Sequence, residues 1–545
     1  MKFKMIRKYK ILFIIIVLLQ LLFCVYMGHQ KRSFFCDEIY SYGLANSEHY
    51  AFLDNVSSKI YGADTNGWVD SNYFKDYVEV NSTDSFSFSA AIQNQISDVH
   101  PPLYYMLLHI VCAFFPDTFT KWTGIGLNLF LTLLVDILLC YIAQTVFRGD
   151  KIKSLMVLWL WAFSAAAVSN ILFIRMYLLQ TVEILAYIAV HIYIVKENYK
   201  PILKGFLLIM TVIIGGLTHY YFYVFAFCFS APICLILLFK KEIRDFLQYS
   251  TLLLSGFLIN LFLFPATLKH VFSGYRGTEV ANNLQGRTEN VFIESYLKWI
   301  NNSIFGGFLK AFVLVAIGIF IYKIYSIYFT MQIQKLSKKI RISIRKCEKE
   351  FEYEMTIDSY SIIYILTTIA TVGFIYVATI GSNLVSNRYI YPAYPIISVW
   401  IINCLFCITK KKIVVWCIST LMCVCSFVNY GVDFQYSDYD EITQNGEMVQ
   451  GDDCLLYYGS DWLDVYTALP LKFQYDETYF FNSDDIENLN EILNARSSYD
   501  NVVVCLPDQM SNQDVNDILN KIISNTEYTT YQSMYHFNTQ AYLLE

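Results

Sequence analysis

The chain has 545 residues, of which 56% are hydrophobic, 17% aromatic and only 16% charged. A soluble protein usually has about 25% charged residues, so this chain has too little polar surface to face water on all sides. Its net charge of −6 shows no basic excess, which argues against nucleic acid as a partner. The composition predicts one large membrane domain with a smaller domain attached.

The N-terminus is basic, with Lys2, Lys4, Arg7, Lys8 and Lys10, and an apolar run over 11–27 follows it. A removable signal peptide would end in a small-x-small cleavage site, and none follows this run. We therefore expect an uncleaved first membrane anchor.

Eleven apolar stretches approach the roughly 20 residues that a helix needs to cross a bilayer. Basic segments lie between them, and the positive-inside rule assigns these segments to the cytoplasm. The assignment is self-consistent only if the short apolar stretch 101–116 does not cross, so we expect a re-entrant or interfacial helix there. The N-terminus is then cytoplasmic and the C-terminus is outside. The predicted spans are 11–27, 123–147, 153–171, 175–195, 204–219, 221–239, 247–267, 304–327, 359–380, 390–408 and 412–431.

Residues 1–431 form the predicted transmembrane domain, with a first outer loop at 28–100, and residues 432–545 form a predicted extracytoplasmic domain. Short runs typical of strands alternate in this tail with runs of helical spacing, which favours a small α/β domain. The predicted strands are 454–458, 478–481, 501–505 and 541–544, and the predicted helices are 461–473, 485–496 and 512–523.

The 14 cysteines follow no disulfide or zinc spacing, and most lie in apolar stretches as small core residues. Cys454 and Cys505 lie in predicted strands of the tail. Sequence does not show whether two cysteines are close in space, so a bridge between them stays open beside two separate thiols.

The first candidate for chemistry is the adjacent acid pair Asp37 and Glu38, just after the first span. Carboxylates at a membrane surface can serve as a general base or bind a metal ion. The alternative is a solvated helix start, where acids are favourable. The remaining acids of the loop are expected to be mostly solvated; they are Glu48, Asp54, Asp64, Asp70, Asp76, Glu79, Asp84 and Asp98.

His100 precedes Pro101 and Pro102. Proline is tolerated in the first turn of a helix, so this spacing sets His100 at or just before a helix N-terminus. Backbone amides and the helix dipole favour anions there, and a histidine in that place can contact a phosphate or a metal. The alternative is that the prolines only shape a turn.

Arg175 interrupts apolar sequence between two predicted spans, where a charge is costly and therefore a functional candidate. The alternative is an arginine that extends to the lipid headgroups. His219 and Tyr220 end another span, and Arg388 precedes Pro392. In the predicted topology the candidates share one membrane face, which suits an anionic substrate with its head at the interface; they are Asp37, Glu38, His100, Arg175, His219 and Arg388.

Two acids, Asp136 and Glu183, fall within predicted spans. In a transporter such residues are candidate proton or ion sites. No basic partner inside the spans is evident from the sequence, so we expect structural hydrogen-bonding roles for both.

The order of these motifs resembles the GT-C glycosyltransferases of the protein O-mannosyltransferase and aminoarabinose-transferase (family 39-like) kind. The resemblance covers roughly residues 1–430, and its five motifs occur in matching order. It is carried by Asp37-Glu38, by His-Pro-Pro-Leu-Tyr-Tyr at 100–105, by Arg-Met-Tyr at 175–177, by Thr-His-Tyr-Tyr at 218–221, and by Arg388-Tyr389 followed by Pro392.

The resemblance implies a polyprenyl-phosphate-linked sugar as donor and an acceptor hydroxyl on a polymer, protein or lipid at the outer face. Asp37 matches the family's first-loop acid, so it would be the general base. Four basic residues would stabilise the departing phosphate, namely Arg175, His100, His219 and Arg388, with Tyr220 beside His219. Some relatives bind a divalent metal, for which Glu38 and His100 could be ligands, although two ligands are too few to define a site.

One position departs from the family, because several relatives have aspartate where this chain has Tyr177, so the resemblance implies a different sugar specificity. Two other kinds of function stay open. A lipid-linked sugar transporter or flippase would need polar groups at intermediate membrane depth. A non-catalytic scaffold would act through a partner-binding tail.

Overall fold

The structure is a computed structural model, and it describes residues 2–48, 68–196, 201–286, 290–319, 321–322, 325, 359–382, 384–436, 453–457, 475–494, 502–507, 510–536 and 539–545. These residues divide into two compact units. The first unit is Met1–Leu21, Thr132–Asn170 and Gln180–Val432, and the second is Leu22–Leu131, Ile171–Leu179 and Asp433–Glu545.

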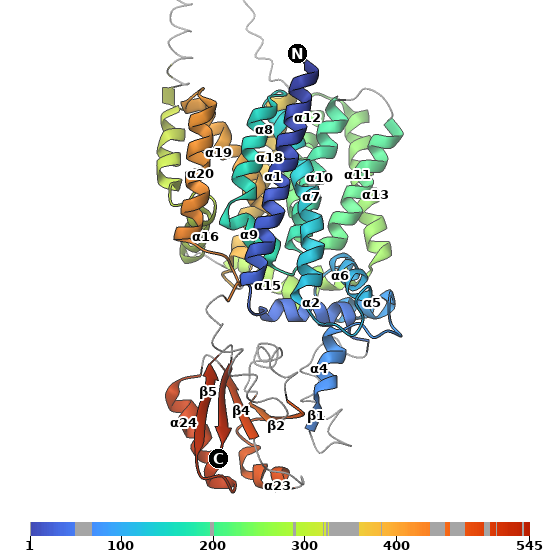
Figure 1. The fold of residues 1–545 in the computed structure, drawn as a ribbon. Helices are drawn as coiled ribbons and strands as arrows, with labels where there is room; N and C mark the ends of the chain where they lie inside the picture. The colour runs from blue at the N-terminus through green and yellow to red at the C-terminus, as the bar shows by residue number, and fades with distance from the viewer. Residues whose placement is uncertain are drawn as a thin grey trace, which may run out of the picture. The chain divides into compact units, whose positions relative to one another are not determined.

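Long apolar helices make up most of the chain (Figure 1). Nine helices of the described residues are long and apolar enough to cross a membrane. This confirms a polytopic helical membrane protein. The long helices are α1 (Lys2–Gln30), α7 (Lys121–Val146), α10 (Tyr177–Lys196), α11 (Pro201–Thr218), α12 (Tyr221–Phe239), α13 (Ile243–Leu263), α18 (Ser359–Gly381), the continuous pair η2 (Asn387–Ala393) and α19 (Tyr394–Ile408), and α20 (Lys412–Asn429).

The predicted span 153–171 is broken into α8 (Lys151–Ala162) and α9 (Ala165–Leu172), which meet at an angle of 62°. Ser164 lies at the break, where its hydroxyl accepts a hydrogen bond from the amide of Ala167. A serine that bonds the third amide ahead starts a new helix, because it satisfies a donor that would otherwise have no partner. Ser426 accepts a hydrogen bond from the amide of Ala165 in the same way.

The predicted span 304–327 coincides with a short apolar helix at Leu309–Ile319, and most of its remaining C-terminal part lies outside the described residues. The stretch 101–116 contains α6 (Leu103–Ala113). At 1.5 Å per residue, α6 is about 16 Å long, which is short of the roughly 30 Å hydrocarbon core. Its length agrees with the expectation of a re-entrant or interfacial helix.

Helices of the first unit pack closely where small residues lie between them. Gly256 on α13 faces Val212 and the backbone of Ile209 on α11, and a Cβ at Gly256 would collide with both. Small residues allow this close approach of two membrane helices. After α13 the chain forms three shorter helices, α14 (Ala266–Phe272), α15 (Tyr275–Gly286) and α16 (Asn290–Ser303).

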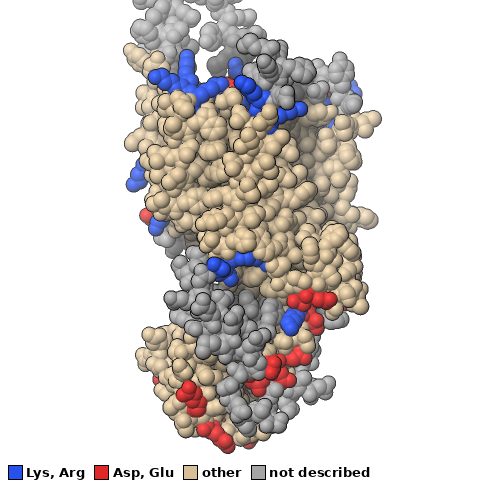
Figure 2. All heavy atoms as spheres, in the orientation of Figure 1, with Lys and Arg blue, Asp and Glu red and all other residues tan. Residues whose placement is uncertain are grey.

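Basic side chains gather at one end of the helices of the first unit (Figure 2). This is the end at which α1 begins (Figure 1). Lys151 and Lys153 at the start of α8 and Lys412 at the start of α20 belong to basic segments of the sequence, and Lys412 pairs with Asp150 at 3.1 Å.

The second unit contains a group of short helices, α2 (Cys36–Asn46), α4 (Ser71–Val78), α5 (Phe88–Ser97) and α6. Gly43 on α2 lies against the ring of Tyr77 on α4, leaving no room for a Cβ. Asn94 on α5 donates to the carbonyl groups of Leu44 and Ser47 and so ties α5 to the end of α2.

The second unit also contains a six-stranded mixed sheet, in the order β1-β3-β2-β4-β6-β5, in which β1 is Trp68–Asp70. The central strand β2 is parallel to β3 and β4, whereas β6 is antiparallel to β4 and to β5. The elements are β2 (Asp453–Tyr457), β3 (Glu477–Phe481), β4 (Val502–Pro507), β5 (Tyr531–His536) and β6 (Thr539–Leu544), with helices η5 (Ile486–Asn488), α23 (Leu489–Asn494) and α24 (Asn512–Asn525).

The four predicted strands and the helices predicted at 485–496 and 512–523 are therefore present, and the helix predicted at 461–473 lies outside the described residues. The sequence did not predict β5. The thiols of Cys454 and Cys505 lie 3.6 Å apart on the neighbouring strands β2 and β4, and both residues are fully buried.

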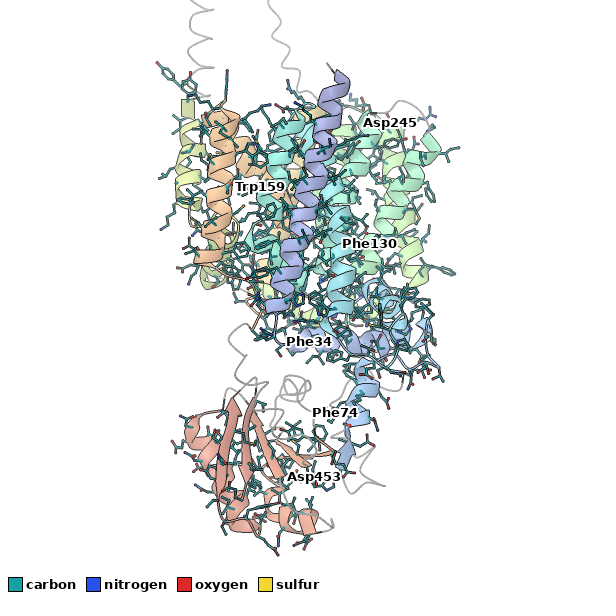
Figure 3. All side chains as sticks on the ribbon, viewed as in Figure 1. Phe34, Phe74, Phe130, Trp159, Asp245 and Asp453 are labelled. Atoms are coloured by element: carbon teal, nitrogen blue, oxygen red, sulfur yellow. The ribbon has the colours of Figure 1, made fainter. Side chains whose placement is uncertain are left out.

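Strand β1 (Trp68–Asp70) comes from the first loop and was also not predicted. It pairs antiparallel with β3, so that Trp68 lies opposite Tyr479 with ring centroids 5.4 Å apart. Phe74 lies on the following helix α4 (Figure 3). Its ring centroid is 6.1 Å from that of Phe480. The first loop thus contributes directly to the core of the C-terminal sheet.

We predict that Trp68→Ala destabilises this sheet by about 3–5 kcal/mol, because truncating a buried tryptophan leaves a cavity. Trp68 is 4% exposed and packs with Leu455 and Leu489 in one hydrophobic cluster. Hydrogen–deuterium exchange on the full chain measures the effect as lost protection of β3. Unchanged protection of β3 would show that β1 does not stabilise the sheet.

Candidate functional site

The first two candidate residues lie in the first turn of α2. Phe35 is the N-cap, and Glu38 folds back so that its side chain accepts a hydrogen bond from the amide of Phe35 at 2.7 Å. This bond, one half of a capping box, fixes the direction in which Glu38 points. Asp37 is half-buried, whereas Glu38 has no exposed surface. Two neighbouring acids that look equivalent in the sequence therefore differ in their access to a ligand.

Glu38 is fully occupied within the protein. One carboxylate oxygen accepts from the ammonium group of Lys31 at 2.9 Å, and the other accepts from the amide of Ile174 at 2.9 Å. Lys31 is itself completely buried. Glu38 therefore holds the loop that carries Arg175, and this role accounts for both of its oxygens.

Arg175 lies against α2 and is 3% exposed. Its Nη1 donates to the backbone oxygen of Asp37 at 3.2 Å and to the hydroxyl of Ser41 at 3.1 Å. The guanidinium lies 5.7 Å from the ring centroids of both Tyr40 and Tyr105. Its Nε has no hydrogen-bond partner among the described residues. The arginine is thus fixed in place, and one donor remains for a ligand.

Asp98 and His100 form a second polar pair in the same unit. One oxygen of Asp98 accepts from Nδ1 of His100 at 2.7 Å and from its backbone amide at 3.2 Å. With the proton assigned to Nδ1 by this bond, Nε2 of a neutral His100 is an acceptor. The Asp98 side chain is 4% exposed and that of His100 is 23% exposed. Asp98 is therefore buried and does not have the solvated role that the sequence predicted.

The charges of this group act on one another. Burial raises the pKa of Asp98, but the charge and hydrogen bond of His100 and the charge of Arg175 outweigh it, so the pKa lies below its usual range. Burial lowers the pKa of His100, and Arg175 lowers it further, against the opposing effect of Asp98 and Asp37. Burial lowers the pKa of Arg175, but Tyr105, Asp37 and Asp98 raise it to a net value above its ordinary one.

These directions give the charge state near pH 7, with Asp98 ionised, His100 neutral and Arg175 positive. Asp37 interacts electrostatically with both His100 and Arg175. Three of the predicted residues, Asp37, His100 and Arg175, are therefore brought together in the second unit. The arrangement can accept a proton and hold an anion.

The other predicted residues lie in the first unit. Nδ1 of His219 accepts from the amide of Tyr221 at 3.1 Å, and the hydroxyl of Tyr220 meets His270 at 2.8 Å. Arg388 is 5% exposed, and its guanidinium lies 5.3 Å from the ring centroid of Tyr389. These residues belong to the ends of α11, α12 and α14 and to η2.

Sequence reasoning missed Arg276, on α15. It pairs with Glu279 at 2.9 Å and interacts electrostatically with Tyr221 and Tyr389. Tyr389 also adjoins Arg388, so the first unit brings two arginines to one group of tyrosines. A single basic residue in a polar loop carries no hydropathy signal, so the sequence pattern did not single out Arg276.

A metal site is not evident in the part of the chain that the structure describes. No group of three or more His, Cys, Asp or Glu side chains lies close enough to hold an ion. Glu38 is one of the two residues that the resemblance offered as possible ligands, and its oxygens are bonded to Lys31 and to backbone amides.

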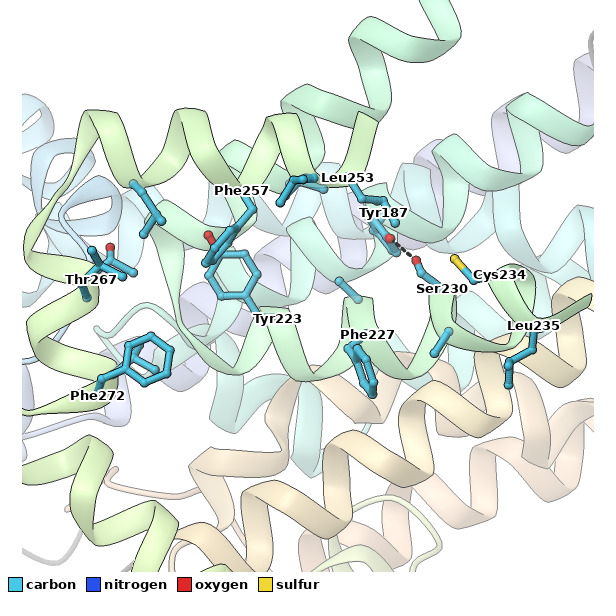
Figure 4. Close-up of a pocket in the computed structure, with 17 residues that line it drawn as sticks. Tyr187, Tyr223, Phe227, Ser230, Cys234, Leu235, Leu253, Phe257, Thr267 and Phe272 are labelled. Atoms are coloured by element: carbon cyan, nitrogen blue, oxygen red, sulfur yellow. Dashed lines mark hydrogen bonds between the residues drawn. The ribbon is translucent and has the colours of Figure 1, made fainter. Parts of the chain in front are cut away.

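An apolar groove of about 810 Å³ runs between helices of the first unit (Figure 4). Its lining residues come from α10, α11, α12, α13 and α14. On α12 they extend from Tyr223 to Leu235, which is about 18 Å at 1.5 Å per residue. Phe227 and Phe272 are 72% and 75% exposed, so the groove opens on the apolar outer surface of these helices.

The groove has one polar region, where the hydroxyls of Tyr187 and Ser230 hydrogen bond (Figure 4). Ser230 also accepts from Tyr249, and Tyr249 meets Nε2 of His191 at 2.8 Å. This network satisfies its polar groups internally, as a site in hydrocarbon requires. Outside this region the lining is apolar apart from the buried hydroxyls of Tyr223 and Thr267, which have no hydrogen-bond partner among the described residues.

We predict that lowering the pH destabilises the native state partly through His100. Its folded pKa lies below the unfolded value of about 6.5, so the unfolded state binds protons first and stability falls as the pH drops below that value. Between pH 8 and pH 5 the thermal midpoint of His100→Gln should therefore fall less than that of the wild type. The exposed His29, changed to Gln, is the control. An identical pH dependence in wild type and His100→Gln would contradict the prediction.

Comparison with solved structures gives matches to this chain. No protein-family model and no curated protein matches the chain. The crystal structure of ArnT from Cupriavidus metallidurans bound to undecaprenyl phosphate is similar over 98% of each chain, with 8% identity and a TM-score of 0.52. The apo-state structure of ArnT from the same organism covers 87% of this chain and 93% of its own, with 8% identity and a TM-score of 0.45.

ArnT is an aminoarabinose transferase of the GT-C group that the sequence motifs resemble. An identity of 8% shows the fold alone. The chain has a GT-C-like fold, a polytopic α-helical membrane architecture with a small C-terminal region of strands.

Proposed function

We propose that this protein is a membrane glycosyltransferase that transfers a sugar from a polyprenyl-phosphate donor to an acceptor hydroxyl at the outer face. The observation that carries the proposal is the half-buried Asp37 in one group with Arg175 and the Asp98–His100 pair. The fold supports it, because the similar ArnT structure is bound to undecaprenyl phosphate.

The reaction breaks the bond between the anomeric carbon and the phosphate oxygen and forms a bond from that carbon to the acceptor oxygen. Asp37 accepts the acceptor's proton as general base, and the electron pair of the broken bond leaves on the phosphate. Arg175 holds the backbone of Asp37 in place through its Nη1. Because His100 is neutral and its Nδ1 donates to Asp98, its Nε2 is an acceptor that can bind a substrate hydroxyl other than the one that Asp37 deprotonates.

The departing phosphate requires positive charge nearby. The Nε of Arg175 is a buried donor with no partner among the described residues, which suits a phosphate oxygen. We assign His219, Tyr220 and Arg388 to the same task on the resemblance. We add Arg276 because it shares a group of tyrosines with Arg388.

The groove of the first unit is suited to the lipid part of the donor. Ligand pockets usually measure about 300–1,000 Å³, and this one is apolar along most of its length. Exposed apolar side chains at its mouth, such as Phe227, allow a chain to enter sideways from the bilayer. We propose that a polyprenyl tail occupies it.

The basic end of the first unit (Figure 2) supports a cytoplasmic N-terminus under the positive-inside rule. Residues 1–431 are then the transmembrane domain, and residues 432–545 form a domain outside the cytoplasm. The acceptor, whether polymer, protein or lipid, approaches from that side.

A lipid-linked sugar flippase is the second candidate, since Asp136 and Glu183 are acids buried within α7 and α10. A flippase moves its substrate across the bilayer and forms no glycosidic bond. Transbilayer movement of a lipid-linked sugar without any transfer product would favour that function.

Asp37→Asn should lower transfer by about 10²–10⁴-fold, because it removes the general base while preserving size. Transfer is measured as the mass change in envelope glycans that depends on this protein. The matched control is Asp76→Asn, on an exposed acid of α4. Full transfer by Asp37→Asn, with normal membrane insertion, would refute the role of Asp37.

Ala226→Trp should weaken binding of undecaprenyl phosphate by about tenfold or more, because the new ring fills the groove and loss of 1.4 kcal/mol of binding free energy corresponds to tenfold. Leu247→Trp is the control, since Leu247 is exposed on α13 but does not line the groove. Equal affinity of both variants for undecaprenyl phosphate would mean that the lipid binds elsewhere.

A further inference from the structure

We propose that residues Asp433–Tyr436, which we call the junction segment, position Asp37 and Arg175 for catalysis. Phe434 is the residue that connects the segment to both. The consequence for catalysis rests on the proposed function, whereas the contacts themselves do not. All the residues involved belong to the second unit.

The ring of Phe434 packs against two phenylalanines. Its centroid is 4.4 Å from that of Phe35 and 4.8 Å from that of Phe173. Phe35 is the N-cap of α2 and lies two residues before Asp37, and Phe173 lies two residues before Arg175. Rings of Phe35 and Phe173 are themselves 6.2 Å apart. Removing the Phe434 ring would therefore loosen both segments at once.

The backbone of Phe434 reaches the same two segments by a second route. Its carbonyl accepts from the ammonium group of Lys31 at 2.6 Å, and Lys31 also donates to Glu38. Glu38 in turn accepts from the amide of Ile174, the neighbour of Arg175. Charge-assisted hydrogen bonds thus connect the junction segment to the start of α2 and, through Glu38, to the loop of Arg175.

Gln435 adds backbone contacts to the end of α1. Its carbonyl accepts from the amide of Arg32 at 2.9 Å, and its side chain donates to the carbonyl of Met27 at 3.1 Å. Because Lys31 lies between these two positions, the contacts of Gln435 hold the segment from which Lys31 reaches Phe434 and Glu38.

The junction segment keeps this shape at a conformational cost. Phe434 and Tyr436 have φ values of +56° and +55°, in the left-handed region that residues with a Cβ rarely occupy. Such a backbone persists only where surrounding contacts over-determine it. Two left-handed residues within three positions indicate that the contacts of Phe434 and Gln435 impose the conformation.

Positioning of this kind affects the rate more than substrate affinity. Arg175 donates to the backbone oxygen of Asp37, so movement of either segment shifts the proposed base. A displacement of about 1 Å at a reacting group can cost on the order of 10²-fold in rate. None of the junction-segment contacts given above involves a lining residue of the apolar groove.

The test uses the full-length chain with a cysteine at position 37 as a reporter, in the change Asp37→Cys. A hydrophilic maleimide labels the cysteine at position 37, and mass spectrometry measures the labelling rate. The labelling of the chain that retains Asp37 is subtracted as background. Phe434→Ala should speed the labelling about tenfold, which corresponds to 1.4 kcal/mol of lost local stability. Phe434→Tyr, which keeps the ring, should restore the slow rate.

The matched control is Phe480→Ala, which removes another ring of the C-terminal sheet, one that packs against Phe74. It should leave the labelling rate unchanged. Should Phe434→Ala not fold, Phe434→Leu is measured in its place, since it keeps volume without the flat ring. Equal labelling of the parent and of folded Phe434→Ala, or of Phe434→Leu where it is measured instead, would overturn the proposal.

The same Phe434 variants, with Asp37 restored, are then assayed for transfer. A fall in kcat with KM for the lipid donor unchanged supports positioning, whereas a change in KM alone contradicts it. Failure of the proposed function is distinguishable from failure of this inference. Full transfer by Asp37→Asn rejects the function, and the labelling of position 37 still decides whether the junction segment holds it.

Discussion

The buried ion pair of Lys31 and Glu38 is the interaction on which the candidate site depends. Taking two charges out of water costs several kcal/mol for each ion, and only additional hydrogen bonds offset that cost. Here the amides of Phe35 and Ile174 and the carbonyl of Phe434 supply them. Removing one partner of such a pair typically costs about 3–5 kcal/mol, because the other charge stays buried alone. The pair therefore holds together three chain segments that are distant in sequence. Asp37 lies on one of these segments and Arg175 on another.

In the proposed function the groove binds the lipid and the candidate site carries the chemistry. Contacts with a long apolar tail are equal in the ground state and the transition state, so the groove contributes affinity and not rate. Charges that meet the reacting atoms act mainly in the transition state, where a proton moves and a phosphate departs. At the groove of the first unit the hydroxyls of Tyr187 and Ser230 are bonded to each other, whereas those of Tyr223 and Thr267 have no partner among the described residues. In the second unit Arg175 keeps one buried donor without a partner among the described residues.

Hydropathy predicted the long helices because a span must be apolar along its whole length, and five motifs located Asp37, His100 and Arg175. Hydropathy did not predict the break at Ser164, because one hydroxyl barely changes the mean hydropathy of a 19-residue stretch. The sequence predicts a solvated Asp98, whereas the structure buries it. Its burial depends on His100 and Arg175, which only the fold brings near. Glu38 was grouped with Asp37 because adjacent residues look alike until a helix turns them to different sides. Strand β1 has three residues, too few for a period of two to be visible.

The pairing of β1 with β3 has a consequence for biosynthesis. Asp70 and Glu477 are register partners although some four hundred residues separate them in the chain. At translation rates of about 5–20 residues per second, the first loop waits on the order of tens of seconds before its partner strand has been made. During that interval Trp68 and Val69, which end up buried, have no sheet to join. Until β3 has been made, other contacts must keep these side chains from water. Early assembly of this protein therefore depends on its surroundings as well as on its own sequence.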